Sequence, residues 1–357
     1  MITHNGSSSW LFRSAWPLDR RAADAANAHQ QQLAKRPGAL GELERIAERV
    51  AAWQGREDPR LEHIAIRVFA ADHGVCAKGV SAFPQAATAQ MIANCLQGGA
   101  AISVFARELK ANLQVYNLGT VSPLPALPGL HDCTIAPETG DFSEQAAMSP
   151  EALIRALRIG AESVPVGPLH LIIGGEMGIG NTSTAAALVS ALRALPAEIT
   201  VGPGAGMDPA RLARKRQAVE SGLALHADAI NASEIPALTA LECLGGFEIA
   251  ALTGAYIRCA QRGIGVLVDS YVSAAAALCA VRINPQVRDW LLFGHVSAEP
   301  AHRLVLERLA AEPLLDLRLR LGEGLGAALA VPLLRAALEL HNNMARSASV
   351  TGAPAIE

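Results

Sequence analysis

The chain has 357 residues, enough for one large domain with a smaller appendage. Hydrophobic residues make up 51% of it but aromatic residues only 4%, so its apolar content is mostly alanine, leucine, valine and isoleucine, which suits helices packed on a parallel sheet. A formal net charge of -3 gives no electrostatic reason to expect a nucleic acid as partner.

Nothing in the spacing of cysteine or histidine indicates a metal centre. The six cysteines are scattered along the chain, without a Cys-x-x-Cys pair. The N-terminal segment carries polar residues where a signal peptide needs an unbroken apolar core, and no apolar run reaches membrane-spanning length. We therefore expect reduced thiols, no metal, no contact with a membrane and a cytoplasmic location.

The first part of the chain predicts helices. Residues 1–16 have no pattern of regular structure and are expected to be disordered. A helix is predicted from Pro17 to a breaker at residues 36–38, and a second helix, with apolar residues at helical spacing, stops at Gly55. Two consecutive helices before any strand indicate a small helical piece.

The middle of the chain, residues 61–330, repeats the order strand, loop, helix. Its first strand, at 63–70, is a near-continuous apolar run, as expected where a parallel sheet is buried on both faces. We predict an α/β fold with a doubly wound, mostly parallel, Rossmann-like sheet, and a small helical domain built from residues 1–60 and the C-terminal helix and tail at 331–357. Residues 121–149 are predicted to form a long functional loop. The predicted strands are 63–70, 112–118, 169–173, 265–269 and 289–293.

Asp72 and His73 follow the first predicted strand. Open α/β sheets bind ligands at the carboxyl ends of their strands, so these two side chains either contact a ligand or order the following loop. The next segment leads into a helix and carries Phe83, Gln90 and Met91. From residue type alone, Phe83 and Met91 are expected in the core.

A glycine-rich stretch, residues 174–192, follows the strand at 169–173 and opens an alanine-rich helix. Gly178 and Gly180 allow a close backbone approach, and the polar residues after them can cap the helix and leave amides free for an anion. The spacing G-x-x-G-x-G differs from the dinucleotide fingerprint, and Glu176 would place a negative charge beside a pyrophosphate. Dinucleotide binding is therefore disfavoured.

A second glycine-rich stretch, residues 201–216, contains Gly202 and Gly204 and leads into a helix that carries Lys215. The free amides of a glycine loop, together with a lysine, can hold a monophosphate. The stretch is not a P-loop, since no Gly-Lys-Ser/Thr follows at the required spacing. The alternative is a mobile surface loop followed by a solvated basic helix face.

Glu323 lies between Gly322 and Gly324 on an apolar approach to the last helix. The two glycines let the backbone bend sharply and let a ligand come close to the acid. Apolar neighbours would strip water from the carboxylate and raise its pKa, which suits a general base. The alternative is that Glu323 is a first-turn helix acid favoured by the helix dipole.

These stretches together resemble one known family, the nicotinate mononucleotide:dimethylbenzimidazole phosphoribosyltransferases, which make the lower-ligand nucleotide of cobalamin. The similarity includes GGEMGIGNTSTAAAL, VGPGAGMDPARLARK and RLGEGLGAALA. Blocks in the family's order occur at residues 33–44, 69–91, 174–188, 201–215, 244–255, 294–302 and 320–330.

The resemblance implies transfer of the 5-phosphoribosyl group from nicotinate mononucleotide to 5,6-dimethylbenzimidazole, giving α-ribazole 5′-phosphate and nicotinate. It implies a homodimer and no cofactor. It assigns the catalytic base to Glu323 and a second active-site acid to Glu176. It places the phosphate and ribose near Gly178, Gly202, Gly204, Lys215 and Ser297, and the aromatic base between Phe83, Gln90, Met91, Met177 and Leu321.

The chemistry of this reaction suits these residue types. Nicotinate in the mononucleotide is bonded through a pyridinium nitrogen, so it leaves as a neutral ring and no metal is needed to carry away pyrophosphate charge. The benzimidazole attacks C1′ with one nitrogen, and a carboxylate in a water-poor site can take the proton from the other. Attack opposite the departing nicotinate inverts C1′, which explains an α product from a β substrate.

The chain departs from the family's usual pattern at Gly294, where some relatives have serine, and in the loop 138–148. These differences bear on ribose contacts and base selectivity and leave the reaction type unchanged. Two other functions are open at this point. One is an NAD-using dehydrogenase, indicated only by the strand-glycine-helix order. The other is a non-enzymatic protein that binds the aromatic base or its riboside.

Overall fold

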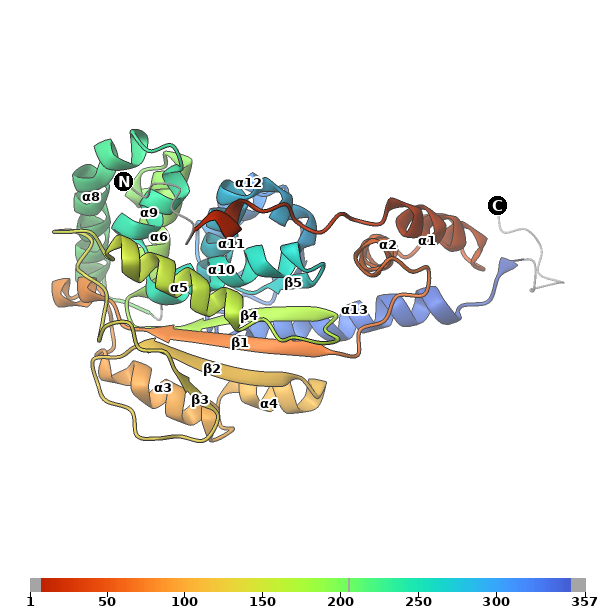
Figure 1. The fold of residues 1–357 in the computed structure, drawn as a ribbon, viewed down its shortest axis with the longest axis horizontal. Helices are drawn as coiled ribbons and strands as arrows, with labels where there is room; N and C mark the ends of the chain where they lie inside the picture. The colour runs from red at the N-terminus through yellow and green to blue at the C-terminus, as the bar shows by residue number, and fades with distance from the viewer. Residues whose placement is uncertain (1–7, 205, 348–357) are drawn as a thin grey trace.

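The structure is a computed structural model that describes residues 8–204 and 206–347. In this part of the chain seven strands form one parallel sheet, in the order β3-β2-β1-β4-β5-β6-β7 (Figure 1). The predicted parallel α/β fold is therefore confirmed. The strands are β1 (Ile64–Ala71), β2 (Asn112–Gly119), β3 (Leu130–Asp132), β4 (Leu171–Met177), β5 (Gly265–Val268), β6 (Leu291–His295) and β7 (Pro313–Leu315).

The α-helices are α1 (Arg20–Gln32), α2 (Glu42–Gln54), α3 (Ala86–Leu96), α4 (Ala101–Leu109), α5 (Pro150–Glu162), α6 (Asn181–Arg193), α7 (Ala197–Thr200), α8 (Pro209–Asn231), α9 (Pro236–Leu244), α10 (Phe247–Gln261), α11 (Tyr271–Ile283), α12 (His302–Arg308) and α13 (Leu325–Asn343). Short 3-10 helices are η1 (Ser9–Phe12), η2 (Gly74–Lys78) and η3 (Pro285–Trp290). Helices α5, α10 and α11 pack on one face of the sheet, and α3, α4 and α13 on the other, as a doubly wound fold requires (Figure 1).

All five strands predicted from apolar runs are present, each within a few residues of its predicted bounds. The two strands that the sequence did not indicate, β3 and β7, lie at the edges of the sheet and have three residues each. A three-residue edge strand is too short to produce a hydrophobic pattern. β3 forms part of the predicted loop 121–149, so that loop is more regular than expected.

The connections of the sheet reverse direction between β1 and β4, its central pair. Loops that leave two such strands diverge, and the crevice between them is where open α/β sheets bind ligands. β1 is followed by Asp72, and β4 ends at Glu176 and Met177. Polar residues therefore lie at the carboxyl ends of both strands that border this crevice.

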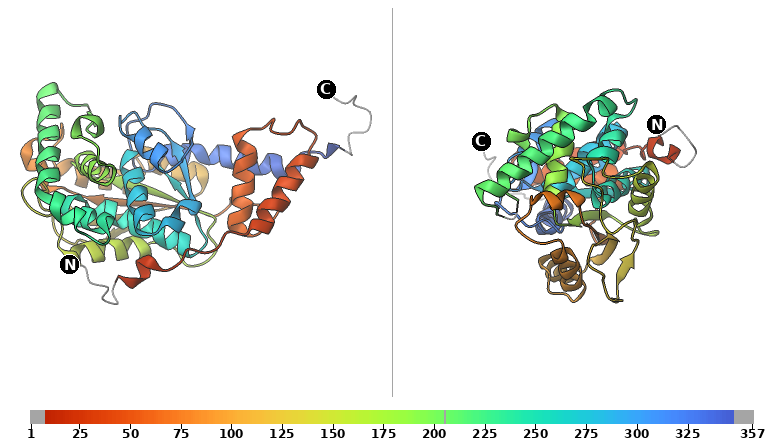
Figure 2. Two further views of the ribbon diagram at one scale, coloured as in Figure 1. Left: turned by 90° about the horizontal axis from the view of Figure 1, so that it is seen from above. Right: turned by 90° about the vertical axis from the view of Figure 1, so that its left-hand side faces the viewer.

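The N-terminal helices α1 and α2 pack on each other, and α2 packs on α13, at the end of the molecule away from α8 (Figures 1 and 2). Asp19 caps α1, which begins slightly later than predicted, and Gly55 ends α2 as predicted, with a φ of 63°. Trp53 of α2 belongs to the same continuous core as the sheet. The division into a separate small helical domain therefore stays a prediction.

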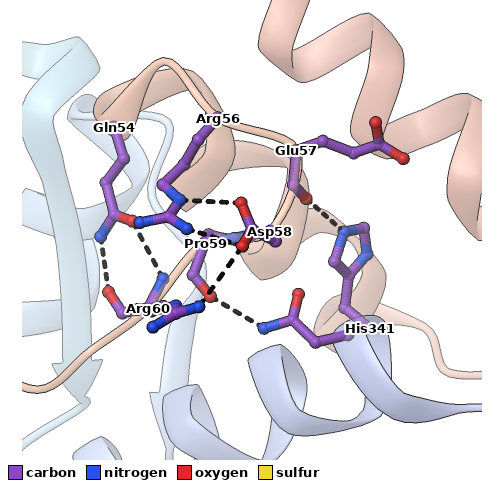
Figure 3. A network of polar contacts seen from close by, with 8 residues as sticks. Gln54, Arg56, Glu57, Asp58, Pro59, Arg60 and His341 are labelled. Carbon is purple, nitrogen blue, oxygen red and sulfur yellow. Dashed lines mark hydrogen bonds and ion pairs between the residues drawn. The ribbon is translucent and has the colours of Figure 1, made fainter.

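The loop between α2 and β1 is tied to the end of α13 (Figure 3). His341 Nε2 lies 2.9 Å from the carbonyl oxygen of Glu57, and Asn342 Nδ2 donates to the carbonyl oxygen of Pro59 at 3.0 Å. Within the loop, Arg56 donates two hydrogen bonds to Asp58. These contacts hold the amino end of β1 against the C-terminal helix.

The prediction of disorder was wrong for residues 8–16. η1 packs its Leu11 side chain, which is fully buried, into the core. Asn284 Nδ2 donates to the carbonyl oxygens of Leu11 and Arg13, at 3.2 and 2.8 Å. One apolar side chain and long-range hydrogen bonds order a segment that has no periodic pattern of its own. The rest of that prediction, residues 1–7, lies outside the described residues.

Candidate active site

A cavity of about 560 Å³ lies beyond the carboxyl ends of the central strands. Its walls come from the loop and helix after β1, the turn from β4 to α6, the glycine loop before α8, the start of α11, and the loops after β6 and β7. Of the residues named by the resemblance, Phe83, Gln90, Met91, Glu176, Met177, Gly178, Gly204, Ser297 and Leu321 line the cavity, whereas Gly202, Lys215 and Glu323 do not.

One wall of the cavity is apolar and open at its mouth. Met177 is almost fully buried in this wall, while Phe83 and Leu321 are 53% and 51% exposed. The expectation that Phe83 is a core side chain was therefore wrong, whereas Met91 is partly buried and packs against the core. Large apolar side chains exposed around a concave site are typical of a surface that receives an aromatic ligand.

Glu176 lies at the end of β4 and faces the cavity from a buried position. Its carboxylate accepts hydrogen bonds from Asn181 Nδ2 and, at 3.4 Å, from Ser270 Oγ. Burial raises its pKa well above the ordinary value, and the nearby charges of Asp269 and Glu248 add to that shift. A ligand with positive charge would favour the ionised form of this carboxyl group.

The prediction that polar residues cap α6 was wrong. The N-cap of α6 is Gly180, without a side-chain cap, and Asn181 is engaged by Glu176 instead. Thr182 lines the cavity at the first turn of this helix. The amino end of α6 therefore faces the cavity, where its dipole favours an anion.

Glu323 lies in a tight turn just before α13. Its φ is 63°, and those of its neighbours Gly322 and Gly324 are 84° and 91°, so three consecutive residues have left-handed backbone. The first turn of α13 contains no acidic residue, so the alternative reading of Glu323 as a first-turn acid was wrong. A Cβ on Gly175 would lie 2.2 Å from the carbonyl oxygen of Glu323, so the turn packs directly on β4.

The Glu323 carboxylate is buried beside the cavity, next to Gly322, which lines it. Burial raises its pKa, against a hydrogen bond from the backbone of Ile102, and the charge of Asp269 raises it further. Its Oε2 atom has no hydrogen-bond partner among the described residues. A buried carboxylate with a raised pKa and an unpaired oxygen is well suited to accept a proton.

Lys215 is fully buried, so the alternative of a solvated basic helix face was wrong. Its Nζ donates to Thr182 Oγ1 at 2.8 Å and to the carbonyl oxygen of Gly202 at 2.9 Å. Burial lowers the pKa of Lys215 to about 8, although the charge of Glu299 acts in the opposite direction. Lys215 thus joins α8, the glycine loop and the amino end of α6, immediately behind the cavity wall.

Asp72 and His73 do not line the cavity. This favours the prediction that they order the following loop over the prediction that they contact a ligand. Asp72 accepts from Thr88 Oγ1 at 2.6 Å and from the backbone nitrogen of Val121 at 2.9 Å. His73 lies 3.0 Å from the Glu248 carboxylate. Burial lowers the pKa of His73, but the carboxyl groups of Glu248, Asp72 and Glu138 together raise it overall.

Two residues beside the predicted site were missed from the sequence. Arg320 is the only basic side chain that lines the cavity among the described residues. Asp269, at the end of β5, is fully buried and contacts the turn that carries Glu323. The sequence does contain a signal for each, since one is an arginine three residues before Glu323 and the other an acid directly after a buried strand. Their contacts, however, can be known only from the folded structure.

The structure accounts for one departure from the family pattern. A Cβ on Gly294 would lie 2.5 Å from the Cα of Ala327, so β6 and α13 approach too closely for a serine at this position. In the divergent loop 138–148, Glu138 accepts from Gln85 Nε2 at 2.6 Å, and Phe142 is buried. This loop braces the segment after β1 that carries Phe83.

None of the helices in residues 8–204 and 206–347 is long and apolar enough to cross a membrane.

Comparison with known proteins gives a consistent result. A family described as phosphoribosyltransferase matches residues 16–351. The nicotinate-nucleotide–dimethylbenzimidazole phosphoribosyltransferase of Pseudomonas syringae pv. syringae is 53% identical over 98% of this chain and 100% of its own length. The protein of that name from Pseudomonas aeruginosa PAO1 is 54% identical over 95% of each chain. The crystal structure of the Thermus thermophilus protein of that name is 42% identical, with a TM-score of 0.87 over 94% of this chain and 100% of its own.

Proposed function

The chain belongs to the family of nicotinate-nucleotide–dimethylbenzimidazole phosphoribosyltransferases, and from this premise we propose how its cavity works. The enzyme transfers the 5-phosphoribosyl group of nicotinate mononucleotide to 5,6-dimethylbenzimidazole, in assembly of the cobalamin nucleotide loop. The products are α-ribazole 5′-phosphate and nicotinate, and Glu323 is the general base. The observation that carries the mechanism is the presence of two buried carboxyl groups, Glu176 in the cavity and Glu323 beside it.

The mononucleotide lies on the side of the cavity formed by α6, the glycine loop and the loop after β6. Its phosphate faces the amino end of α6 and the backbone at Gly178 and Gly204, with Gly202 and Lys215 directly behind them. Ser297, from the loop after β6, borders the ribose. Dimethylbenzimidazole lies on the apolar side, among Phe83, Gln90, Met91, Met177 and Leu321.

Glu176 faces the positive charge of the substrate. Nicotinate is bonded to C1′ through a pyridinium nitrogen, and that cation favours the ionised form of a carboxyl group whose pKa burial has raised. The charge on the ring disappears as the bond to C1′ breaks, because nicotinate leaves with a neutral nitrogen. The developing charge on the ribose is then stabilised by the same carboxylate.

Glu323 takes the proton of the attacking base. As one nitrogen of dimethylbenzimidazole bonds to C1′, positive charge makes its other N–H acidic. The Glu323 side chain reaches this proton by rotating about its own χ angles, from its contact with the backbone of Ile102 toward the cavity. Attack from the face opposite nicotinate inverts C1′.

The two other functions considered from the sequence are disfavoured by the family relationship. An NAD-using dehydrogenase would bind NAD tightly, whereas this cavity has Glu176 where a pyrophosphate would lie. A storage protein would bind the base without turnover. Incubating the purified protein with both substrates tests the proposal. We expect nicotinate release only when both are present, and no tight binding of NAD in a titration. A homodimer and a cytoplasmic location stay predictions.

Arg320 is expected to help select the mononucleotide. We propose that its guanidinium pairs with the carboxylate of nicotinate, since the phosphate has its own partners and Arg320 is the one basic side chain lining the cavity among the described residues. Arg320→Gln should raise KM for nicotinate mononucleotide by about three- to tenfold, as the pair is partly exposed. KM for nicotinamide mononucleotide, which has no carboxylate, should change little.

The control for this measurement is Arg318→Gln, an exposed arginine two residues away that does not line the cavity. Arg320→Lys should recover part of the loss because it restores the charge without the fork of donors. An equal rise in KM for both mononucleotides would assign Arg320 to the phosphate instead, and unchanged KM values would remove it from substrate binding.

A further inference from the structure

Asp269 connects the end of β5 to the turn that carries Glu323. It is fully buried and does not line the cavity. Its Oδ2 accepts from the backbone nitrogen of Gly324 at 3.1 Å, and its Oδ1 accepts from the backbone nitrogen of Ala327 at 2.9 Å. The first amides of a helix have no partner within the helix, and the N-cap of α13, Gly324, has no side chain to supply one. Asp269 therefore caps the amino end of α13 from a different element, the end of β5.

The turn needs such support because its backbone conformation is sterically unfavourable. Gly322, Glu323 and Gly324 all have left-handed φ values, and only the glycines adopt them without steric cost. A strained conformation persists only when the surrounding structure holds it. Asp269 accepts from the residue directly after Glu323 and from the first turn of α13, so it constrains the carboxyl side of the turn.

The neighbours of Asp269 connect it to α13 and to Glu176. His295 at the end of β6 places its Nε2 atom 3.6 Å from Asp269 Oδ1. The His295 ring packs against Gly326, where a Cβ would lie 1.9 Å from ring atom Cδ2. On the other side, Ser270 follows Asp269, lines the cavity and donates to Glu176. The end of β5 thus contacts the surroundings of both carboxyl groups of the proposed mechanism.

We propose that Asp269 is a positioning residue for the transfer, which fixes the turn of Gly322 and Gly324 so that Glu323 stays beside the cavity, with His295 as its partner. The inference rests on the proposed role of Glu323. Asp269 does not touch substrate, and it acts on the rate only through the turn and through its charge.

The charge of Asp269 also acts on the proposed base. Burial is the main cause of the raised pKa of Glu323 and of Glu176, and the charge of Asp269 raises both pKa values further. Around Glu323, the other titratable groups are Glu176 on β4 and Cys95 on α3. Around Asp269 they are His295 on β6 and Tyr256 on α10. Removing the charge of Asp269 should lower the pKa of Glu323. Because the base must be ionised, the acid limb of kcat then moves to lower pH.

The experiment compares Asp269→Asn with the wild-type enzyme. Asparagine keeps one oxygen acceptor for the turn but loses the charge and the second acceptor. We expect kcat to fall by about 10- to 100-fold, the acid limb of kcat to move to lower pH, and KM for nicotinate mononucleotide to stay within about threefold. Asp316→Asn is the matched control, since Asp316 is an exposed acid paired with Arg303, and it should leave activity unchanged.

Unchanged kcat and an unchanged acid limb in a folded Asp269→Asn enzyme would overturn the proposal, and so would a loss that appears only in KM. If Asp269→Asn does not fold, the same measurements are made on His295→Gln. For this variant we expect a smaller loss in kcat at constant KM, and an unchanged kcat would overturn the proposal. An inactive wild-type enzyme would instead contradict the proposed mechanism, so the two failures are distinguishable.

Discussion

The Glu323→Gln enzyme is expected to bind both substrates but to release nicotinate about 10²- to 10⁴-fold more slowly than wild type in kcat. Glutamine keeps the size of the side chain and one acceptor oxygen while removing the basic carboxylate. The turn that Asp269 holds is formed by backbone atoms and should be unaffected. Steady-state release of nicotinate at saturating concentrations of both substrates measures the effect.

The pH dependence of kcat provides an internal check on this substitution. Burial raises the pKa of Glu323 above its ordinary value, so in wild type kcat should be lost as pH falls through that raised pKa. The residual activity of Glu323→Gln should lack this acid limb. Glu307→Gln, an exposed acid on α12, is the matched control. Activity of Glu323→Gln within a few-fold of wild type would end the general-base assignment.

Lys215→Ala is expected to raise KM for nicotinate mononucleotide by about 10- to 100-fold and to change KM for dimethylbenzimidazole much less. The ammonium group holds Thr182 Oγ1 and the carbonyl oxygen of Gly202 together behind the proposed phosphate site. Without it, both acceptors lose a charged donor, and the Glu299 carboxyl group loses the positive charge that opposes the rise of its pKa. The loop that receives the phosphate should then lose its fixed geometry.

Initial rates at varied concentrations of each substrate separate the two KM values. Arg211→Ala, on the same helix but exposed and paired with Asp208, should leave both unchanged. Lys215→Arg should also have a raised KM for the mononucleotide, because a guanidinium group is too large for a fully buried site. An unaltered KM for the mononucleotide in Lys215→Ala would place the phosphate elsewhere in the cavity.

The fold could be predicted from the sequence because the strands β1, β4, β5 and β6 are buried on both faces. These strands are rich in apolar residues, and a run of that kind is visible without knowing its neighbours. The edge strands β3 and β7 lack this signal because they are short. The sequence also failed to predict that residues 8–16 are ordered. The burial of Leu11 and the long-range hydrogen bond to its carbonyl oxygen stabilise this segment only in the folded chain.

The candidate site was predicted in part, because residue type and position relative to a strand suggest a role but not a partner. Glu176 could be placed at the crevice since it ends a buried strand. The burial of Lys215 could not be predicted, because it depends on α6 and the glycine loop packing against α8. For the same reason Asp269 was missed, since the amides it holds are more than fifty residues away in the chain.

The most direct test of the account is the configuration at C1′ of the nucleotide that the enzyme makes, measured by NMR in a mixture of the purified protein, nicotinate mononucleotide and 5,6-dimethylbenzimidazole. Direct transfer within one cavity predicts an α-linked ribazole phosphate, formed in the same amount as nicotinate and only when the base is present. A β-linked nucleotide, or ribose 5-phosphate formed while the base stays unreacted, would contradict it.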